Sequence, residues 1–166
     1  MRERTCCFTG HRNLPVACRK ELVEKLEETI VRLIQDGIQF FEAGGALGFD
    51  TLAAQAVLRV KEKHPDIKLS LILPCLTQTR GWTETDVKEY ERIKGLADEV
   101  IYTSQKYIRG CMFKRNRYLV DNSSICVCYL TENTGGTAYT VRYAKNRDRK
   151  SSTLPRRFAG SAIKKL

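Results

Sequence analysis

Apolar runs alternate along this chain with stretches whose apolar residues recur at helical spacing. The runs predict strands at residues 4–10, 38–45, 67–74, 98–104 and 124–130. The periodic stretches predict helices over residues 19–37, 49–64, 83–97, 111–123 and 135–146. Five βα units in series, with nearly continuous apolar strands, are typical of an α/β protein whose mainly parallel sheet is covered by helices on both faces.

The length and the charge distribution divide the chain into a domain and a tail. With 166 residues, of which 42% are hydrophobic, the chain is long enough for one core, which we assign to residues 1–146. The remainder, 147–166, holds seven Lys or Arg against one acid, so it carries +6 of the net charge of +10. A basic tail of this kind is either a solvated end or a nucleic-acid contact.

The tail shows little sign of regular structure. Only the segment "SAIKKL" at 161–166 offers a weak strand pattern, and Pro155 and Gly160 interrupt pairing before it. We therefore expect residues from about 151 onward to be either loosely held or docked through few apolar contacts.

Cysteine, histidine and hydropathy patterns limit the class of protein. The seven cysteines form no CxxC pair, which favours free thiols in a reducing cytoplasm. No apolar stretch approaches the roughly 20 residues that span a bilayer, so no membrane partner is expected. The two histidines, His11 and His64, lack ligand spacing, so we expect no metal and no other cofactor.

Glycines gather in loops that follow predicted strands. Because ligands of such sheets bind at the carboxyl ends of the strands, these loops are where a site is expected. Backbone N–H groups at a helix start attract phosphate, and glycine allows its close approach, although a glycine that only satisfies a positive φ gives the same pattern. We expect valine at Gly45 or Gly136 to block a ligand while leaving the fold largely intact. The candidates in these loops are Gly10, His11, Arg12, Gly44, Gly45, Gly48, Asp50, Gly135, Gly136 and Thr137.

Three of these side chains have two interpretations each. Arg12 and His11 are either phosphate ligands, with the histidine donating, or a surface pair. Asp50 is either the cap of a helix or a group that reaches the hydroxyls of a ligand. The spacing G-G-x-x-G before Asp50 also differs from the G-x-G-x-x-G dinucleotide fingerprint.

Four motifs, "TGHR", "GGALGFD", "RNRYLVDNS" and "NTGGT", together resemble the YpsA/YoqJ-like family of the SLOG superfamily, over residues 4–146. That superfamily also contains the DNA-processing protein DprA/Smf and the LOG-type enzymes. The resemblance implies a bacterial or phage protein with a Rossmann-like three-layer α/β/α fold of five or six strands. It also implies a sensing module for a small nucleotide-like ligand, held in part by Arg115 and Asn116, and permits a homo-oligomer.

Two alternatives follow from the same resemblance. LOG-type enzymes cleave the N-glycosidic bond of a nucleoside monophosphate, and here Met112, Arg115 and Leu119 match their helix motif. The glutamate of their second motif falls on Thr140 or Arg142, so the catalytic candidates reduce to Arg115 and Asp50, with Glu42 as a further carboxylate only if it reaches the same pocket. The second alternative is DprA-like binding of single-stranded DNA. Helical spacing also allows Arg115 to be an ordinary exposed charge.

Overall fold

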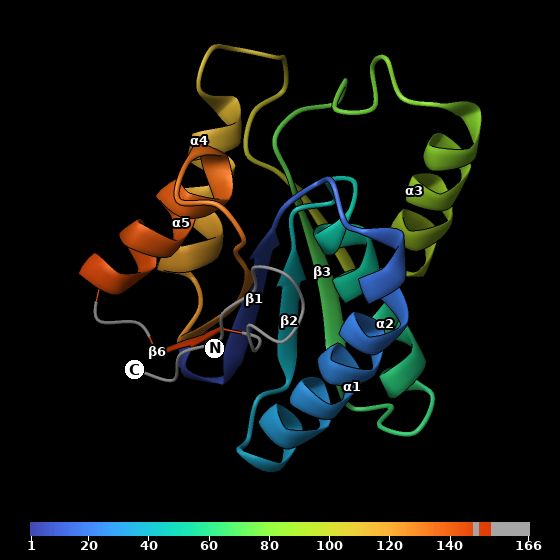
Figure 1. Cartoon of the computed structure of the whole chain (residues 1–166), viewed down its shortest axis with the longest axis vertical. Coiled ribbons are helices and arrows are strands. Elements are labelled where there is room, and N and C mark those ends of the chain that lie inside the picture. Colours follow the sequence, from blue (N-terminus) through green and yellow to red (C-terminus); the bar gives the residue numbers. More distant parts are fainter. Residues whose placement is uncertain (148–149, 154–166) are drawn as a thin grey trace.

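The computed structural model describes residues 1–147 and 150–153 and contains one six-stranded sheet of order β4-β3-β2-β1-β5-β6 (Figure 1). Every neighbouring pair of strands in it is parallel. This confirms the predicted Rossmann-like α/β class. The strands are β1 (Thr5–Gly10), β2 (Phe40–Ala43), β3 (Lys68–Leu73), β4 (Glu99–Tyr102), β5 (Ile125–Tyr129) and β6 (Lys150–Thr153).

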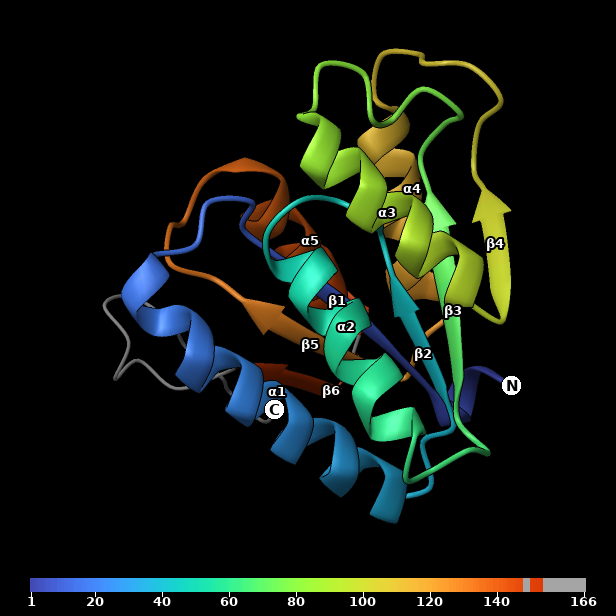
Figure 2. The same cartoon turned by 90° about the vertical axis from the view of Figure 1, so that its right-hand side faces the viewer.

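Helices cover both faces of the sheet, as the apolar strands require. On one face α1 (Arg19–Gln35) packs against α2 (Phe49–Lys61), and α2 packs against α3 (Glu84–Leu96). On the other face α4 (Cys111–Asp121) packs against α5 (Gly135–Asn146). Figure 2, turned by 90°, shows α1, α2 and α3 in front of the strands. Short 3-10 turns at Arg2–Arg4 and Val16–Cys18 precede β1 and α1.

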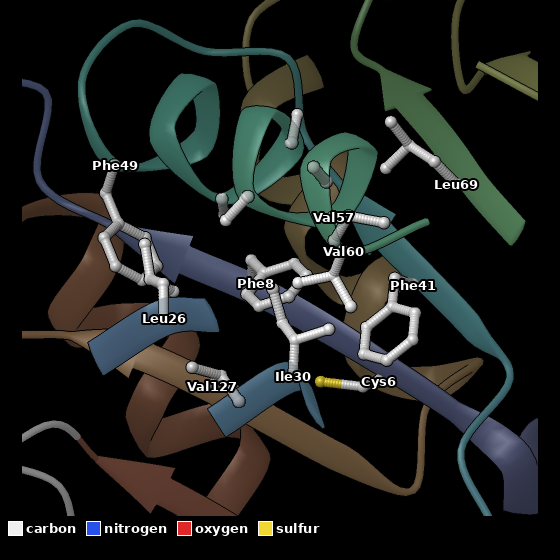
Figure 3. Packing of buried hydrophobic residues seen from close by; sticks show 14 of the residues in the cluster. Cys6, Phe8, Leu26, Ile30, Phe41, Phe49, Val57, Val60, Leu69 and Val127 are labelled. Carbon is white, nitrogen blue, oxygen red and sulfur yellow. The ribbon is translucent and has the colours of Figure 1, made fainter. Parts of the chain in front are cut away.

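The core follows from the alternation of side chains along each strand. In β1, Cys6 and Phe8 belong to the large cluster under α1 and α2, whereas Cys7 belongs to the smaller cluster under α4 and α5. Figure 3 shows the large cluster, where Leu26 and Ile30 of α1 meet the sheet. Cys6, Cys7, Cys18, Cys75, Cys111 and Cys126 are free thiols, and of the seven cysteines only Cys18 is not buried.

The strand β6 differs from the sequence expectation for the tail. It pairs with β5 from Ile125↔Lys150 to Cys128↔Thr153, so the sheet continues past the predicted boundary at residue 146. Its sequence, "KSST", has no apolar residue, and nothing in the hydrophobic pattern marks it as a strand. The expected weak strand at 161–166 lies outside the described residues.

Deletion of residues 151–166 is expected to lower the free energy of unfolding by less than about 3 kcal/mol. The reason is that β6 is an edge strand, so water can replace its hydrogen bonds to β5. Urea unfolding measures the loss, with deletion of 154–166, which keeps β6, as the control. A loss above about 3 kcal/mol in the longer deletion alone would place β6 in the cooperative core.

Candidate functional site

The order of the strands creates a switch point beside β1. From β1 the chain moves outward through β2 and β3 to β4, and it then returns to the other side of β1 as β5. The loops that follow β1 and β5 therefore diverge at the carboxyl edge of the sheet. In open α/β sheets this is the crevice where ligands bind.

A cavity of about 290 Å³ lies at this switch point, under the first turns of α4 and α5. It brings together eight of the twelve predicted ligand residues, whereas Gly44, Gly45, Gly48 and Gly135 do not line it. Glu42 does not line it either. A larger hollow of about 890 Å³ runs along α1 and α2, but none of the predicted site residues lines it. The lining residues of the cavity are Phe8, Thr9, Gly10, His11, Arg12, Ala46, Asp50, Met112, Arg115, Asn116, Leu119, Gly136 and Thr137.

Arg115 and Asp50 form a buried ion pair in this cavity, with Nη1 3.7 Å from Oδ2. Each residue is only 5% exposed, so the interpretation of Arg115 as an exposed charge is wrong. Burial raises the pKa of Asp50, against the opposing effects of Arg115, the Ala46 N–H and Arg12. Burial likewise lowers the pKa of the Arg115 guanidinium, against the effect of Asp50. In this pair, the charged form of each side chain is therefore stabilised by the opposite charge of its partner rather than by water.

Most of the donors of Arg115 are already engaged within the protein. Nη1 donates to the Gly44 carbonyl and Nε donates to Asn116 Oδ1 at 2.7 Å. Within the described part of the chain, Nη2 has no such partner. Arg115 can thus offer a ligand one nitrogen instead of the full guanidinium fork that a free arginine presents.

Asp50 is not the helix cap that the sequence allowed. The N-cap of α2 is Gly48, and Asp50 lies in the first turn, where its Oδ2 accepts the Ala46 N–H at 3.3 Å. This hydrogen bond joins two parts of the β2–α2 loop, and the ion pair connects the loop to Arg115. A contact between Asp50 and ligand hydroxyls stays a prediction.

The glycines of the β2–α2 loop are required by the close approach of their neighbours. A Cβ on Gly44 would overlap the Arg115 guanidinium, and one on Gly48, where φ is +78°, would overlap the Arg12 carbonyl. At Gly45 φ is +64°, and a Cβ would lie 2.6 Å from Leu73 Cδ2. Gly45→Val therefore strains the fold itself, contrary to our expectation of an intact fold. Gly10 is similar, because its Cβ would meet the Phe49 ring.

Gln78, in the β3–α3 loop, does not line the cavity, but it supports the β2–α2 loop in a way that the sequence did not reveal. Its Nε2 donates to the Gly44 carbonyl at 3.1 Å, beside the bond from Arg115, and the residue is buried. A glutamine in a long polar loop carries no motif. The glycine run itself was the only signal, since a bare backbone that becomes buried leaves carbonyls that need donors.

His11 connects the loop after β1 to the loop after β5. Its Nε2 accepts the N–H groups of Thr131 at 2.9 Å and Glu132 at 3.3 Å, so the proton of the neutral ring sits on Nδ1. Burial lowers the pKa of His11, which favours this neutral form. Only Nδ1 is left to donate to a ligand. These contacts directly support a structural role for His11, which is to hold the β5–α5 loop in place.

Donors that line the cavity and have no partner among the described residues come from three places. The exposed guanidinium of Arg12 makes no hydrogen bond or ion pair with the described residues, and its charge acts on Asp50 and Arg115. At the start of α5, Gly136 and Thr137 line the cavity, and the N-cap Thr134 provides no side-chain cap. The Nδ2 of Asn116 lies on the same side, 3.9 Å from where a Gly136 Cβ would be. This set of donors suits an anion.

Among the described residues, no group of three or more His, Cys, Asp or Glu side chains is placed to hold a metal ion. None of the helices in residues 1–147 has the length and apolar character to cross a membrane.

Comparison with solved structures shows the fold. DNA processing protein A from Helicobacter pylori, which binds single-stranded DNA, matches with a TM-score of 0.67 at 19% identity, over 95% of this chain and 67% of that one. DprA from Streptococcus pneumoniae matches with a TM-score of 0.67 at 13% identity, over 92% of this chain and 50% of that one.

Sequence comparison shows the family. A UPF0398 protein of Halalkalibacterium halodurans is 34% identical over 124 residues, which are 73% of this chain and 66% of the length of that protein. A UPF0398 protein of Bacillus thuringiensis is 31% identical over 131 residues, 76% of this chain and 71% of its own length. The YpsA family model, described as the YspA SLOG family, matches residues 6–156, and the chain belongs to that family.

Proposed function

We propose that this protein binds a nucleotide or nucleotide-derived phosphate ligand in the cavity at the switch point, as a sensing or regulatory module. The observation that carries the proposal is the set of unpartnered donors there, with Arg12 at the mouth and the uncapped start of α5 beside it. A phosphate at this position accepts bonds from first-turn N–H groups and from a guanidinium. At about 290 Å³ the cavity is just below the roughly 300–1,000 Å³ range of ligand sites, which favours a ligand no larger than a mononucleotide.

The buried pair of Arg115 and Asp50 then serves as the rigid floor of the site. It fixes the β2–α2 loop through the Gly44 carbonyl, so the ligand meets a preformed surface instead of ordering a loop. The Nη2 of Arg115 and the Nδ2 of Asn116 are the floor groups left to contact the sugar or a second phosphate oxygen.

The glycosidase alternative finds less support in this geometry. Among the described residues that line the cavity, Asp50 is the only carboxylate, whereas glycoside hydrolysis ordinarily employs two. Thr140, at one position where LOG-type enzymes have their glutamate, donates to the Gly136 carbonyl at 2.8 Å. Arg142, at the other, donates to the Asn133 carbonyl. Neither position supplies an acid or a base.

Arg12→Ala is expected to weaken a phosphorylated ligand by about 1.5–3 kcal/mol and its unphosphorylated nucleoside much less. A thermal-shift screen of nucleoside monophosphates, ADP-ribose, NAD and cyclic nucleotides first selects the probe, since saturation at 100 times the Kd stabilises by about 2.7 kcal/mol. Calorimetric titration of that probe and of its nucleoside then measures the effect.

Arg80→Ala is the matched control, because Arg80 is an exposed arginine on the β3–α3 loop that does not line the cavity. Gly136→Val supplies an independent block, since Gly136 lines the cavity and a Cβ there has only an ordinary contact with Asn116. Equal affinities in Arg12→Ala and Arg80→Ala, or no stabilisation by any phosphorylated probe, would refute the proposal.

A further inference from the structure

A second hollow, of about 510 Å³, lies on the outer side of α4 and α5, where exposed apolar side chains gather. Ile108 is 52% exposed, Phe113 is 44% exposed, and the neighbouring Tyr107 is 67% exposed. Such side chains normally avoid water, so their concentration at one place marks a surface that binds something. We call this hollow, with Ile108, Arg109, Phe113, Lys114, Arg117 and Tyr139 in its wall, the aromatic groove.

The aromatic groove is separate from the cavity of the proposed function. Met112, Arg115 and Asn116 of α4 face the cavity, whereas Phe113, Lys114 and Arg117 of the same helix face the groove. The two sites therefore lie on opposite sides of α4, and the inference does not depend on the proposed function.

Aromatic rings form part of the groove wall. Phe113 of α4 and Tyr139 of α5 meet edge to face, with ring centroids 4.8 Å apart, and Tyr139 stacks on Tyr143 at 6.2 Å. The two helices thus hold the rings in fixed orientations. A planar, unsaturated partner can stack on rings that are already ordered without a large entropic cost.

The charge of the groove has one sign. Arg109, Lys114 and Arg117 contribute three cations, and no acid is among the described residues that line the groove. Lys114 donates to the Thr103 carbonyl, but the exposed guanidinium groups of Arg109 and Arg117 make no hydrogen bond or ion pair within residues 1–147 and 150–153. The groove thus combines ordered rings with unpaired positive charge.

We propose that the aromatic groove binds single-stranded nucleic acid. Unpaired bases stack on Phe113 and Tyr139, while Arg109 and Arg117 neutralise the phosphates between them. A duplex fits poorly, because its bases are stacked on one another. An anionic membrane also fits poorly, since insertion requires apolar side chains that protrude, and Phe113 and Tyr139 line a hollow.

Binding of a fluorescein-labelled oligothymidylate of about 15 nucleotides to the full chain, followed by fluorescence anisotropy, tests the proposal. Phe113→Ala is expected to weaken binding by about 5- to 150-fold, as for the loss of one stacked base, and Phe113→Tyr is expected to retain it. Arg117→Ala is expected to reduce the slope of log affinity against log salt by about 0.7. Circular dichroism checks that the variants are folded.

Matched controls lie on α3, away from the groove. Leu96→Ala removes another exposed apolar side chain, 52% exposed, and Lys88→Ala removes another exposed cation. The proposal is overturned if Phe113→Ala binds like Leu96→Ala, or if the oligonucleotide does not bind at all. It is also overturned if a duplex or a phosphatidylserine vesicle binds more tightly, or if deletion of 154–166 alone abolishes binding. None of these results bears on the Arg12 test of the cavity.

Discussion

Arg115→Ala is expected to lower the free energy of unfolding by about 3–5 kcal/mol at neutral pH. The variant leaves Asp50 buried without its counter-ion and removes a donor from the Gly44 carbonyl, so the β2–α2 loop loses two of its attachments. The loss should grow as the pH rises, because an isolated buried carboxylate has a raised pKa and destabilises the fold only when ionised. Urea unfolding at pH 5 and pH 8 measures both effects.

Arg117→Ala, which removes an exposed arginine from the same helix, is the control and should change stability by no more than about 0.5 kcal/mol. The double variant Asp50→Asn, Arg115→Met should recover part of the loss, because it removes both charges. A loss below about 1 kcal/mol, or a double variant that is worse than Arg115→Ala, would show that the pair does not hold the loop. Arg115→Ala is accordingly a poor reporter of ligand binding, for which Arg12 is the better choice.

Glu42→Gln is expected to remove a pH dependence of stability worth about 3 kcal/mol. Glu42 lies on β2 between Cys7 and Ser70, and its buried Oε2 has no hydrogen-bond partner among the described residues. Burial, together with the nearby Glu99, raises the pKa of Glu42 from 4.5 to about 7. Between these values the folded state binds more protons than the unfolded state, so the free energy of unfolding falls as the pH rises. At about 1.36 kcal/mol for each pKa unit, the total is about 3 kcal/mol.

The measurement is urea unfolding of the wild type and of Glu42→Gln at pH 5 and pH 8. The wild type should lose stability relative to the variant on going to pH 8, where the buried carboxylate is ionised. Glu62→Gln, at an exposed glutamate that caps the C-terminus of α2, controls for a general change in charge. An unchanged difference between wild type and Glu42→Gln at the two pH values would mean that Glu42 is solvated.

The hydrophobic pattern was sufficient for five of the six strands and all five long helices of the described residues, because each of these elements packs apolar side chains against the core. It failed for β6, whose "KSST" sequence pairs through its backbone with the edge of β5. Helix boundaries were close where a side chain marks them, as at Thr83, which accepts the Asp86 N–H at the start of α3.

The position of the site could be predicted from the sequence, but the hydrogen bonds and ion pairs within it could not. Glycines after parallel strands indicate an edge where ligands bind, and eight of the twelve candidates do line one cavity. Periodicity placed Arg115 one turn from Met112 and Leu119, but it could not reveal a bond to the Gly44 carbonyl, 71 residues away. Nor could it show that His11 accepts two N–H groups, since a sequence does not state which nitrogen carries the proton.

The close approach of Gly44 to Arg115 also links the evolutionary histories of the two positions. Any side chain at 44 would overlap the guanidinium, so as long as the arginine is retained every substitution of this glycine carries a steric penalty. Loss of the arginine removes most of this penalty, but a Cβ at 44 would still lie only 2.7 Å from Asp50 Oδ2. We therefore expect positions 44, 50 and 115 to change together, because a side chain at 44 fits only when both buried charged side chains have been replaced or have moved.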